Sequence, residues 1–209
     1  MSLKQVKLTM LVCTLSLGFG ESTLAGKAPT VRSLVEVRQQ NVVIQNWDLS
    51  CGAAALATIL NFQHGDIVTE REVATLMMSR ADYLANPILV RLRQGFSLLD
   101  MKRFVDERGY NGIGLGRLTI DHLIARAPVI VPINSFGYQH FVVFRGLLDN
   151  RVLLADPAFG NRTMPLSDFD SAWIEFAEVG RVGFVVERTD GLIPPNQLAP
   201  LPGEFVTLN

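Results

Sequence analysis

The chain has 209 residues, of which 48% are hydrophobic, and it carries a formal net charge of −1. This length suffices for one domain with a full core, and the hydrophobic content excludes an intrinsically disordered chain. The near-neutral charge and the lack of any run of basic residues exclude a typical nucleic-acid-binding protein. We therefore expect one folded domain whose partner is not a nucleic acid.

The N-terminus, residues 1–25, has the composition of a secretory signal peptide. Two lysines precede an apolar run from Leu8 to Phe19, and small residues that end at Ala25 follow. This is the order of the positive, hydrophobic and cleavage regions of such a signal, and the run is shorter than the roughly 20 residues that span a membrane. We expect cleavage near Ala25, export to the periplasm and no stable membrane span afterwards. An uncleaved anchor and a lipoprotein signal through Cys13 are the alternatives.

Helical patterns dominate the first half of the predicted domain, which spans residues 26–190. Residues 31–43 alternate in part and are interpreted as an edge strand. Residues 81–94 show no clear period and are interpreted as a loop. Capping residues and helix breakers predict helices from Cys51 to about Phe62, after Thr69, from Ser97 to Gly109, and from Thr119 or Asp121 to Pro128.

Strand patterns dominate the second half. They predict a short strand at 110–115 and longer apolar strands at 129–134, 140–146, 152–156 and 182–187. Asp149-Asn150 is a turn signal that joins two of these strands into a hairpin. Ser167 is expected to cap a short helix that contains Trp173, and residues 191–209 are expected to form an irregular tail. Helices followed by strands indicate an α+β domain.

Cys51 is the only cysteine outside the predicted signal peptide. A lone thiol cannot form an internal disulfide after export, which makes it a candidate nucleophile. Asp48 and Ser50 are both N-cap residue types and place Cys51 in the first turn of its helix. Unpaired backbone N–H groups and the positive end of the helix dipole there stabilise a thiolate, the nucleophilic form of cysteine. A buried, inert cysteine is the alternative interpretation.

Three histidines are candidates for the base that a cysteine nucleophile requires. His64 follows the Cys51 helix at its far end, His122 lies in a charged helical turn, and His140 opens an apolar strand. The predicted hairpin returns the chain to the level of His140 at Asp156. That carboxylate could hold the imidazole with its other nitrogen facing Cys51. Taken singly, His140 could be a core histidine and Asp156 a turn residue.

Four motifs occur in order along the chain. They are Gln45-x5-Cys51-Gly52-Ala53-Ala54-Ala55-Leu56, Gly95-x-Ser97-Leu98-x-Asp100-Met101, His140-Phe141-Val142-Val143 and Asp156-Pro157-Ala158-x-Gly160. In this order and spacing, the chain resembles the C39 peptidases, which are papain-like cysteine peptidases that remove double-glycine leaders. The resemblance covers roughly residues 35–188. With its own export signal and no ATPase motif, the sequence resembles the stand-alone, Fap-type members of secretion and amyloid operons.

The resemblance implies an α+β, papain-like fold in which a helical half carries the catalytic helix and packs on a C-terminal antiparallel β-sheet. It implies that Cys51 is the nucleophile and His140 the general base and acid. Asp156 would orient His140, and Gln45, six residues before Cys51, would donate its amide N–H to the oxyanion.

The implied activity is that of a cysteine endopeptidase that cleaves a peptide bond in an exported protein or a leader peptide and supports secretion or amyloid assembly. Its partner would be a peptide or protein substrate, and no cofactor is expected. An amidase or transpeptidase on the same scaffold, and a non-catalytic module that binds an exported client, are the alternatives. One mature cysteine and three scattered histidines show no metal-ligand spacing.

Overall fold

A computed structural model describes residues 32–92, 95–135, 137–201 and 203–205 of the protein. The predicted signal peptide, residues 1–25, lies outside these residues. Within the described ranges, no helix has both the length and the hydrophobicity that crossing a membrane requires.

Helices come first along the chain. They are α1 (Leu34–Arg38), α2 (Cys51–Thr58), the π-helix η1 (Ile59–His64), α3 (Glu70–Met78), α4 (Ala81–Ala85), α5 (Ile88–Leu92), α6 (Leu98–Glu107) and, after β1 (Tyr110–Leu115), α7 (Ile120–Arg126). The strands that follow are β2 (Val129–Ser135), β3 (Tyr138–Leu148), β4 (Arg151–Asp156), β5 (Gly160–Pro165) and, after α8 (Leu166–Ala172), β6 (Glu175–Phe176), β7 (Gly180–Arg181) and β8 (Gly183–Arg188). This order confirms the α+β prediction.

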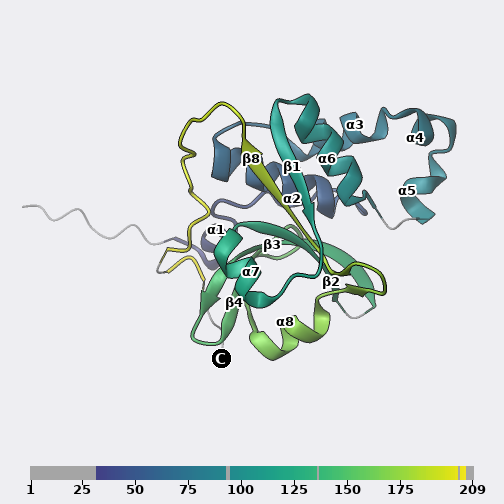
Figure 1. The fold of residues 1–209 in the computed structure, drawn as a ribbon. Coiled ribbons are helices and arrows are strands. Elements are labelled where there is room, and N and C mark those ends of the chain that lie inside the picture. Colours follow the sequence, from purple (N-terminus) through teal and green to yellow (C-terminus); the bar gives the residue numbers. More distant parts are fainter. Residues whose placement is uncertain (1–31, 93–94, 136, 202, 206–209) are drawn as a thin grey trace, which may run out of the picture. The chain divides into compact units, whose positions relative to one another are not determined.

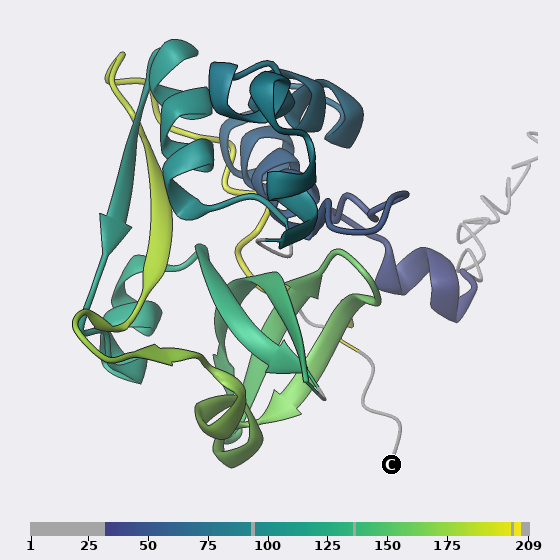
Figure 2. The ribbon, with the colours of Figure 1, turned by 90° about the vertical axis from the view of Figure 1, so that its right-hand side faces the viewer.

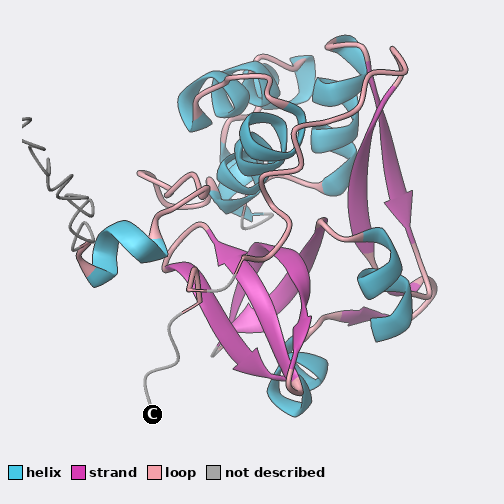
Figure 3. Ribbon diagram, turned by 90° about the vertical axis from the view of Figure 1, so that its left-hand side faces the viewer, coloured by secondary structure: helices cyan, strands magenta, loops and turns pink. Residues whose placement is uncertain are grey.

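Six strands form one antiparallel sheet in the order β1-β8-β2-β3-β4-β5 (Figure 3). The hairpin predicted between β3 and β4 is confirmed: Asp149 and Asn150 form its turn with φ of 47° and 61°, which is the left-handed geometry that two-residue hairpin turns favour. Neither β5 nor the small β6–β7 pair was predicted from the sequence. The strand β5 extends the sheet beyond β4, next to Asp156.

Helices cover both faces of the strands β2–β5. Figures 1 and 2 show α2, α3 and α6 on one side and α8 on the other. One apolar cluster joins α2, α3 and α6 to the sheet through residues such as Leu56, Met101 and Val143. A second cluster joins α7 and α8 to the opposite face through residues such as Leu123 and Phe169. The strands β2, β3 and β4 are therefore buried on both faces over most of their length.

The central helix, α2, is buried along its whole length. A side chain at Gly52 would bring a Cβ to 2.6 Å from the Met101 methyl group and 3.4 Å from the Phe141 ring, so this glycine allows α2 to pack closely on α6 and β3. The helix continues as η1 and ends at Gly65, whose φ of 73° matches a left-handed helix end. The extent of the predicted helix is confirmed, but its last six residues form a π-helix.

The predicted edge strand at 31–43 is wrong, because α1 occupies its centre. The Ser33 hydroxyl accepts a hydrogen bond from the Glu36 N–H, and the Glu36 carboxylate accepts one from the Ser33 N–H (2.6 Å). This capping box is a local helix-start signal that outweighs the partial alternation of the apolar residues. The same arrangement starts α3, α6 and α7 at the predicted caps Thr69, Ser97 and Thr119.

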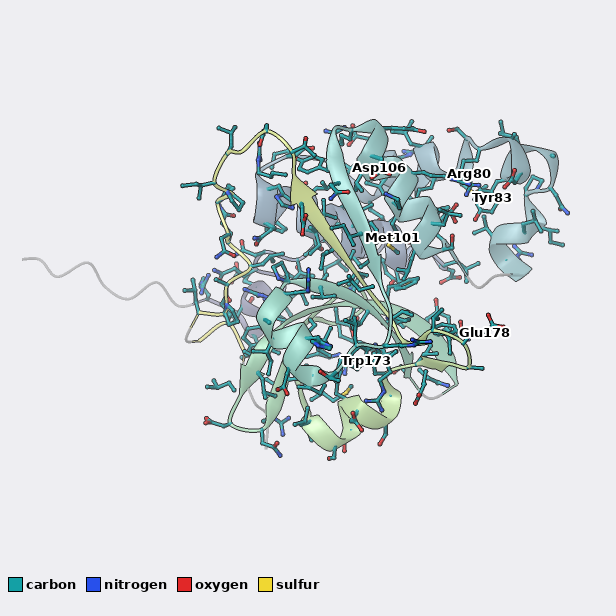
Figure 4. The ribbon with its side chains drawn as sticks, viewed as in Figure 1. Arg80, Tyr83, Met101, Asp106, Trp173 and Glu178 are labelled. Carbon is teal, nitrogen blue, oxygen red and sulfur yellow. The ribbon has the colours of Figure 1, made fainter. Side chains whose placement is uncertain are left out.

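Two further predictions are corrected. The segment 81–94 contains α4 and α5 instead of a loop. The helix α4 is held to α6, because Tyr83 donates a hydrogen bond to the buried Asp100 carboxylate (2.6 Å) and Arg80 pairs with the same group. Figure 4 shows Arg80 and Tyr83 close together, at the start and in the middle of α4. Ser167 does not cap α8, since it lies within the helix and Pro165 occupies the N-cap position.

The described part of the tail, residues 191–201 and 203–205, contains no helix or strand, yet it packs on the sheet. Leu198 is buried, and its carbonyl accepts a hydrogen bond from Arg145 Nε (2.8 Å). Arg145, which is fully buried on β3, also pairs with Glu204 (2.7 Å) and with the Asn161 amide oxygen (2.9 Å). The tail thus supplies partners for a charged group inside the domain.

Candidate active site

Cys51 is the first residue of α2, as predicted, and it is buried. The helix N-terminus is not capped in the predicted way, because the Ser50 side chain forms no capping hydrogen bond. Its hydroxyl lies 2.6 Å from the Trp47 carbonyl oxygen and also contacts the carboxylate of Glu70. The loop before Cys51 is therefore fixed from outside the helix.

Glu70 organises this loop from the first turn of α3. Its buried carboxylate accepts hydrogen bonds from the Asn46 N–H (3.0 Å to each oxygen) and from Asn46 Nδ2 (2.8 Å), besides its contact with Ser50. Glu70 was not among the residues predicted for the site. A glutamate in a first helical turn is common, because its negative charge interacts favourably with the positive end of the helix dipole. The sequence therefore carries no signal of the contact between Glu70 and the loop.

His140 and Asp156 lie side by side at the ends of β3 and β4. Both are buried, and His140 Nε2 is 2.7 Å from Asp156 Oδ1. The same oxygen accepts a hydrogen bond from the Ala158 N–H (2.8 Å), and Oδ2 accepts one from Arg162 Nε (2.7 Å). The predicted hairpin thus brings the two residues together, and the unpredicted strand β5 supplies a third group, Arg162.

Burial and neighbouring charges act in opposite directions on this pair. Burial lowers the pKa of His140, but the hydrogen bond to Asp156 and the interaction with Cys51 outweigh it and raise that pKa to about 9. Burial raises the pKa of Asp156, whereas the bond to His140 and the charge of Arg162 hold it below its usual value. At neutral pH, the site therefore favours an imidazolium beside a carboxylate.

The second ring nitrogen of His140, Nδ1, is the one left for Cys51. It is buried and forms no hydrogen bond of standard geometry with the described residues, while Cys51 lies near enough to the ring to raise the pKa of His140. Cys51, His140 and Asp156 therefore form a row with the imidazole in the middle. This is the arrangement that a base between a nucleophile and an orienting acid requires.

Gln45 lies beside this row. Its backbone N–H donates to the carbonyl of Pro157 (2.9 Å), the residue after Asp156, and its side-chain Nε2 is 3.4 Å from the Trp47 carbonyl oxygen. Its Oε1 is buried and has no hydrogen-bond partner among the described residues. The structure thus brings Gln45 to the loop that leads to Cys51, without a hydrogen bond between the two side chains.

The other two histidines have structural surroundings. His64 is buried at the end of η1, with Nε2 3.1 Å from the Val186 carbonyl oxygen, and His122 Nδ1 accepts a hydrogen bond from the Thr119 N–H (3.2 Å). Among the described residues, no three His, Cys, Asp or Glu side chains are grouped as metal ligands would be.

One cavity adjoins the row of side chains at His140, and a second lies beside Arg162. One, of about 220 Å³, is lined by His140 together with aromatic residues that include Phe96, Phe141 and Phe176. The other, of about 610 Å³, is lined by Arg162 and by parts of β2, β5 and α8. Tyr138, which is 40% exposed, places its ring centroid 6.0 Å from that of His140. The row is therefore buried, and His140 is the member that lines a cavity.

Residues 39–178, most of the described chain, match the sequence model of the family described as Peptidase C39 family. The chain belongs to the peptidase C39 family. Two curated relatives of this C39 chain are 39% identical to it, one over 167 residues from Pseudomonas aeruginosa and one over 169 residues from Pseudomonas fluorescens. Both are named "Probable functional amyloid protease FapD", and each alignment covers 79% of this chain and 70% of the relative.

Solved structures show the fold of this C39 chain. A double glycine motif protease from an AMS/PCAT transporter, in complex with the leader peptide, has a TM-score of 0.55 at 23% identity, covering 71% of this chain and 91% of that one. The peptidase domain of Streptococcus ComA, a bi-functional ABC transporter of a quorum-sensing pathway, has a TM-score of 0.55 at 18% identity, covering 71% and 98%. The expected papain-like α+β fold is thereby confirmed.

Proposed function

We propose that this C39 family member is a cysteine endopeptidase whose catalytic group is Cys51, His140 and Asp156. The observation that carries the proposal is the position of His140: its Nε2 is held by Asp156 at 2.7 Å, and its Nδ1 is left for Cys51. A pKa of about 9 for His140 supports an imidazolium that stabilises the Cys51 thiolate at neutral pH.

In the proposed reaction, the Cys51 thiolate attacks the carbonyl carbon of a peptide bond. The carbonyl oxygen becomes an oxyanion. In this proposal, the Cys51 backbone N–H and the Gln45 amide N–H donate to that oxyanion; one such donor is typically worth about 3 kcal/mol. His140 then gives its Nδ1 proton to the leaving amine as the C–N bond breaks. Water, deprotonated by His140, hydrolyses the thioester and releases the acid and the free thiol.

We propose an exported protein or leader peptide as the substrate, and the periplasm as the site of action. The predicted signal peptide supports export, and the names of the relatives, which refer to functional amyloid, support a substrate in amyloid assembly. The aromatic cavity beside His140 offers apolar side chains of an extended segment a place next to the scissile bond.

The proposal is tested with the mature protein, residues 26–209, and a proteome-derived peptide mixture analysed by mass spectrometry. We expect new peptide termini with the wild type and none with Cys51→Ser or His140→Ala. His122→Ala, a surface histidine outside the site, serves as the matched control and should cleave like the wild type. Cleavage that persists in Cys51→Ser would refute the assignment of the nucleophile, and binding without cleavage by the wild type would favour the non-catalytic alternative.

A further inference from the structure

The guanidinium of Arg162 binds the side of the Asp156 carboxylate that His140 leaves free. Arg162 Nε donates to Oδ2 at 2.7 Å, whereas Oδ1 faces His140. The register of β4 and β5 explains this contact, because Gly160 stands opposite Asp156 and has no side chain to intervene. Arg162, two residues further along β5, reaches diagonally across to the carboxylate.

We propose that Arg162 is a positioning residue, which holds Oδ2 of Asp156 so that Oδ1 stays turned towards His140. This inference rests on the proposed function. A carboxylate is free to rotate unless both of its oxygens are bound, and here the Ala158 N–H fixes Oδ1 while Arg162 fixes Oδ2. Without Arg162, Oδ2 would lose its charged donor, which favours rotation or protonation of the group.

The charges around Asp156 set the direction of the expected effect. Among the described residues, His140 faces it from β3 and Arg162 from β5, Cys51 of α2 lies beyond His140, and Asp168 of α8 lines the cavity beside Arg162. Burial raises the pKa of Asp156, and the positive charge of Arg162 counteracts this rise. Removal of Arg162 therefore raises the pKa of Asp156, so His140 loses its anionic partner at a higher pH.

The cavity beside Arg162 allows chemical rescue. It has a volume of about 610 Å³ and lies between the end of β2, β5 and α8, with Arg162 in its wall. Truncation of this side chain to alanine would extend the cavity to Oδ2 of Asp156. A methylguanidinium ion could then enter and donate the lost hydrogen bond.

The test follows the rate of Cys51 alkylation by iodoacetamide against pH. The acid limb is the low-pH part of this profile, in which the rate rises with pH. In Arg162→Ala, we expect the acid limb to move up by about one pH unit, which lowers the rate about tenfold at a pH on that limb. Methylguanidinium should reverse the shift. Arg162→Met, which is neutral, fills much of the same space and has no hydrogen-bond donor, should show the same shift if the alanine variant does not fold. The matched control is Arg151→Ala on β4, whose guanidinium binds Thr163 Oγ1 (2.9 Å); its acid limb should equal that of the wild type.

An unchanged acid limb in both Arg162 variants would overturn the proposal. So would a rate that falls equally at every pH and does not respond to methylguanidinium, because that result indicates a role in the fold alone. Failure of the proposed function has a different signature: the wild type itself would then label only near pH 8.5, the range of an unperturbed thiol.

Discussion

Replacement of Glu70 by alanine tests whether the loop before Cys51 is held in place from α3. The change removes the acceptor for the Asn46 N–H, for Asn46 Nδ2 and for the Ser50 hydroxyl. Hydrogen bonds to charged groups contribute about 1.5–3 kcal/mol each. Asn46 is exposed and can bond water instead, and the Ser50 hydroxyl, although only 4% of Ser50 is exposed, still has the Trp47 carbonyl oxygen as an acceptor. We therefore expect a loss of about 1.5–3 kcal/mol in the free energy of unfolding, the contribution of about one hydrogen bond to a charged group.

The functional effect of Glu70→Ala should exceed this loss of stability. A misplacement of about 1 Å at a reacting group can cost about a hundredfold in rate, so we expect kcat/KM and the Cys51 alkylation rate to fall by that order under conditions where the variant is fully folded. Urea unfolding and iodoacetamide labelling measure the two effects separately.

Glu72→Ala is the matched control on the same helix. Glu72 accepts the Thr69 N–H in the capping box (2.7 Å), so its loss should cost about 1 kcal/mol in stability but leave Cys51 labelling unchanged. If folded Glu70→Ala labels at the wild-type rate, the loop does not depend on Glu70 and the reasoning is refuted.

Four further predictions follow from the buried polar groups. Glu204→Gln should lower the free energy of unfolding by about 3 kcal/mol in urea titrations, because it leaves the buried Arg145 charge with neutral partners. Its control is Asp170→Asn at the exposed pair with Arg181, which should lower the free energy of unfolding by less than about 1 kcal/mol. Asp156→Asn should lower kcat at least tenfold and move the basic limb of kcat/KM below pH 9, since the anion that raises the pKa of His140 is gone; an unmoved limb would contradict this. The raised pKa of His140 contributes stability that is complete below about pH 6.5 and is lost as the pH rises through about 9. The urea midpoint of His140→Ala should therefore depend less on pH over that range than the midpoint of the wild type. Burial lowers the pKa of His64, so the wild type should lose stability as pH falls below about 6.5, and a His64→Gln variant with the same acid dependence would show that another group is responsible.

The sequence predicts those parts of this fold that depend on local signals. The capping box at Thr69 and Glu72 and the turn at Asp149 and Asn150 involve residues close together in the chain, and the structure has both. The hairpin in turn places His140 next to Asp156, because antiparallel strands return the chain to the same level. Pairing of these two site residues could therefore be anticipated without any knowledge of the tertiary structure.

The remainder depends on contacts between distant segments. Glu70 and Ser50 are 20 residues apart, and Arg145 and Glu204 are 59 apart; neither pair has a pattern in the sequence that reveals it. The strand β5 escaped prediction because Gly160-Asn161-Arg162-Thr163 is polar, and its polar residues bind Gln40 and Asp156 instead of solvent. Polar strands of this kind are identified only when their buried partners are known.

The central claim, a thiolate–imidazolium pair between Cys51 and His140, is tested most directly by the pH dependence of Cys51 alkylation in the wild type and in His140→Ala. Iodoacetamide reacts with the thiolate, and Cys51 is the only cysteine after residue 25, so in a protein of residues 26–209 the signal belongs to one residue. We predict fast labelling of the wild type well below pH 7 and its loss in His140→Ala. Labelling that rises only near pH 8.5 in both proteins would contradict the account.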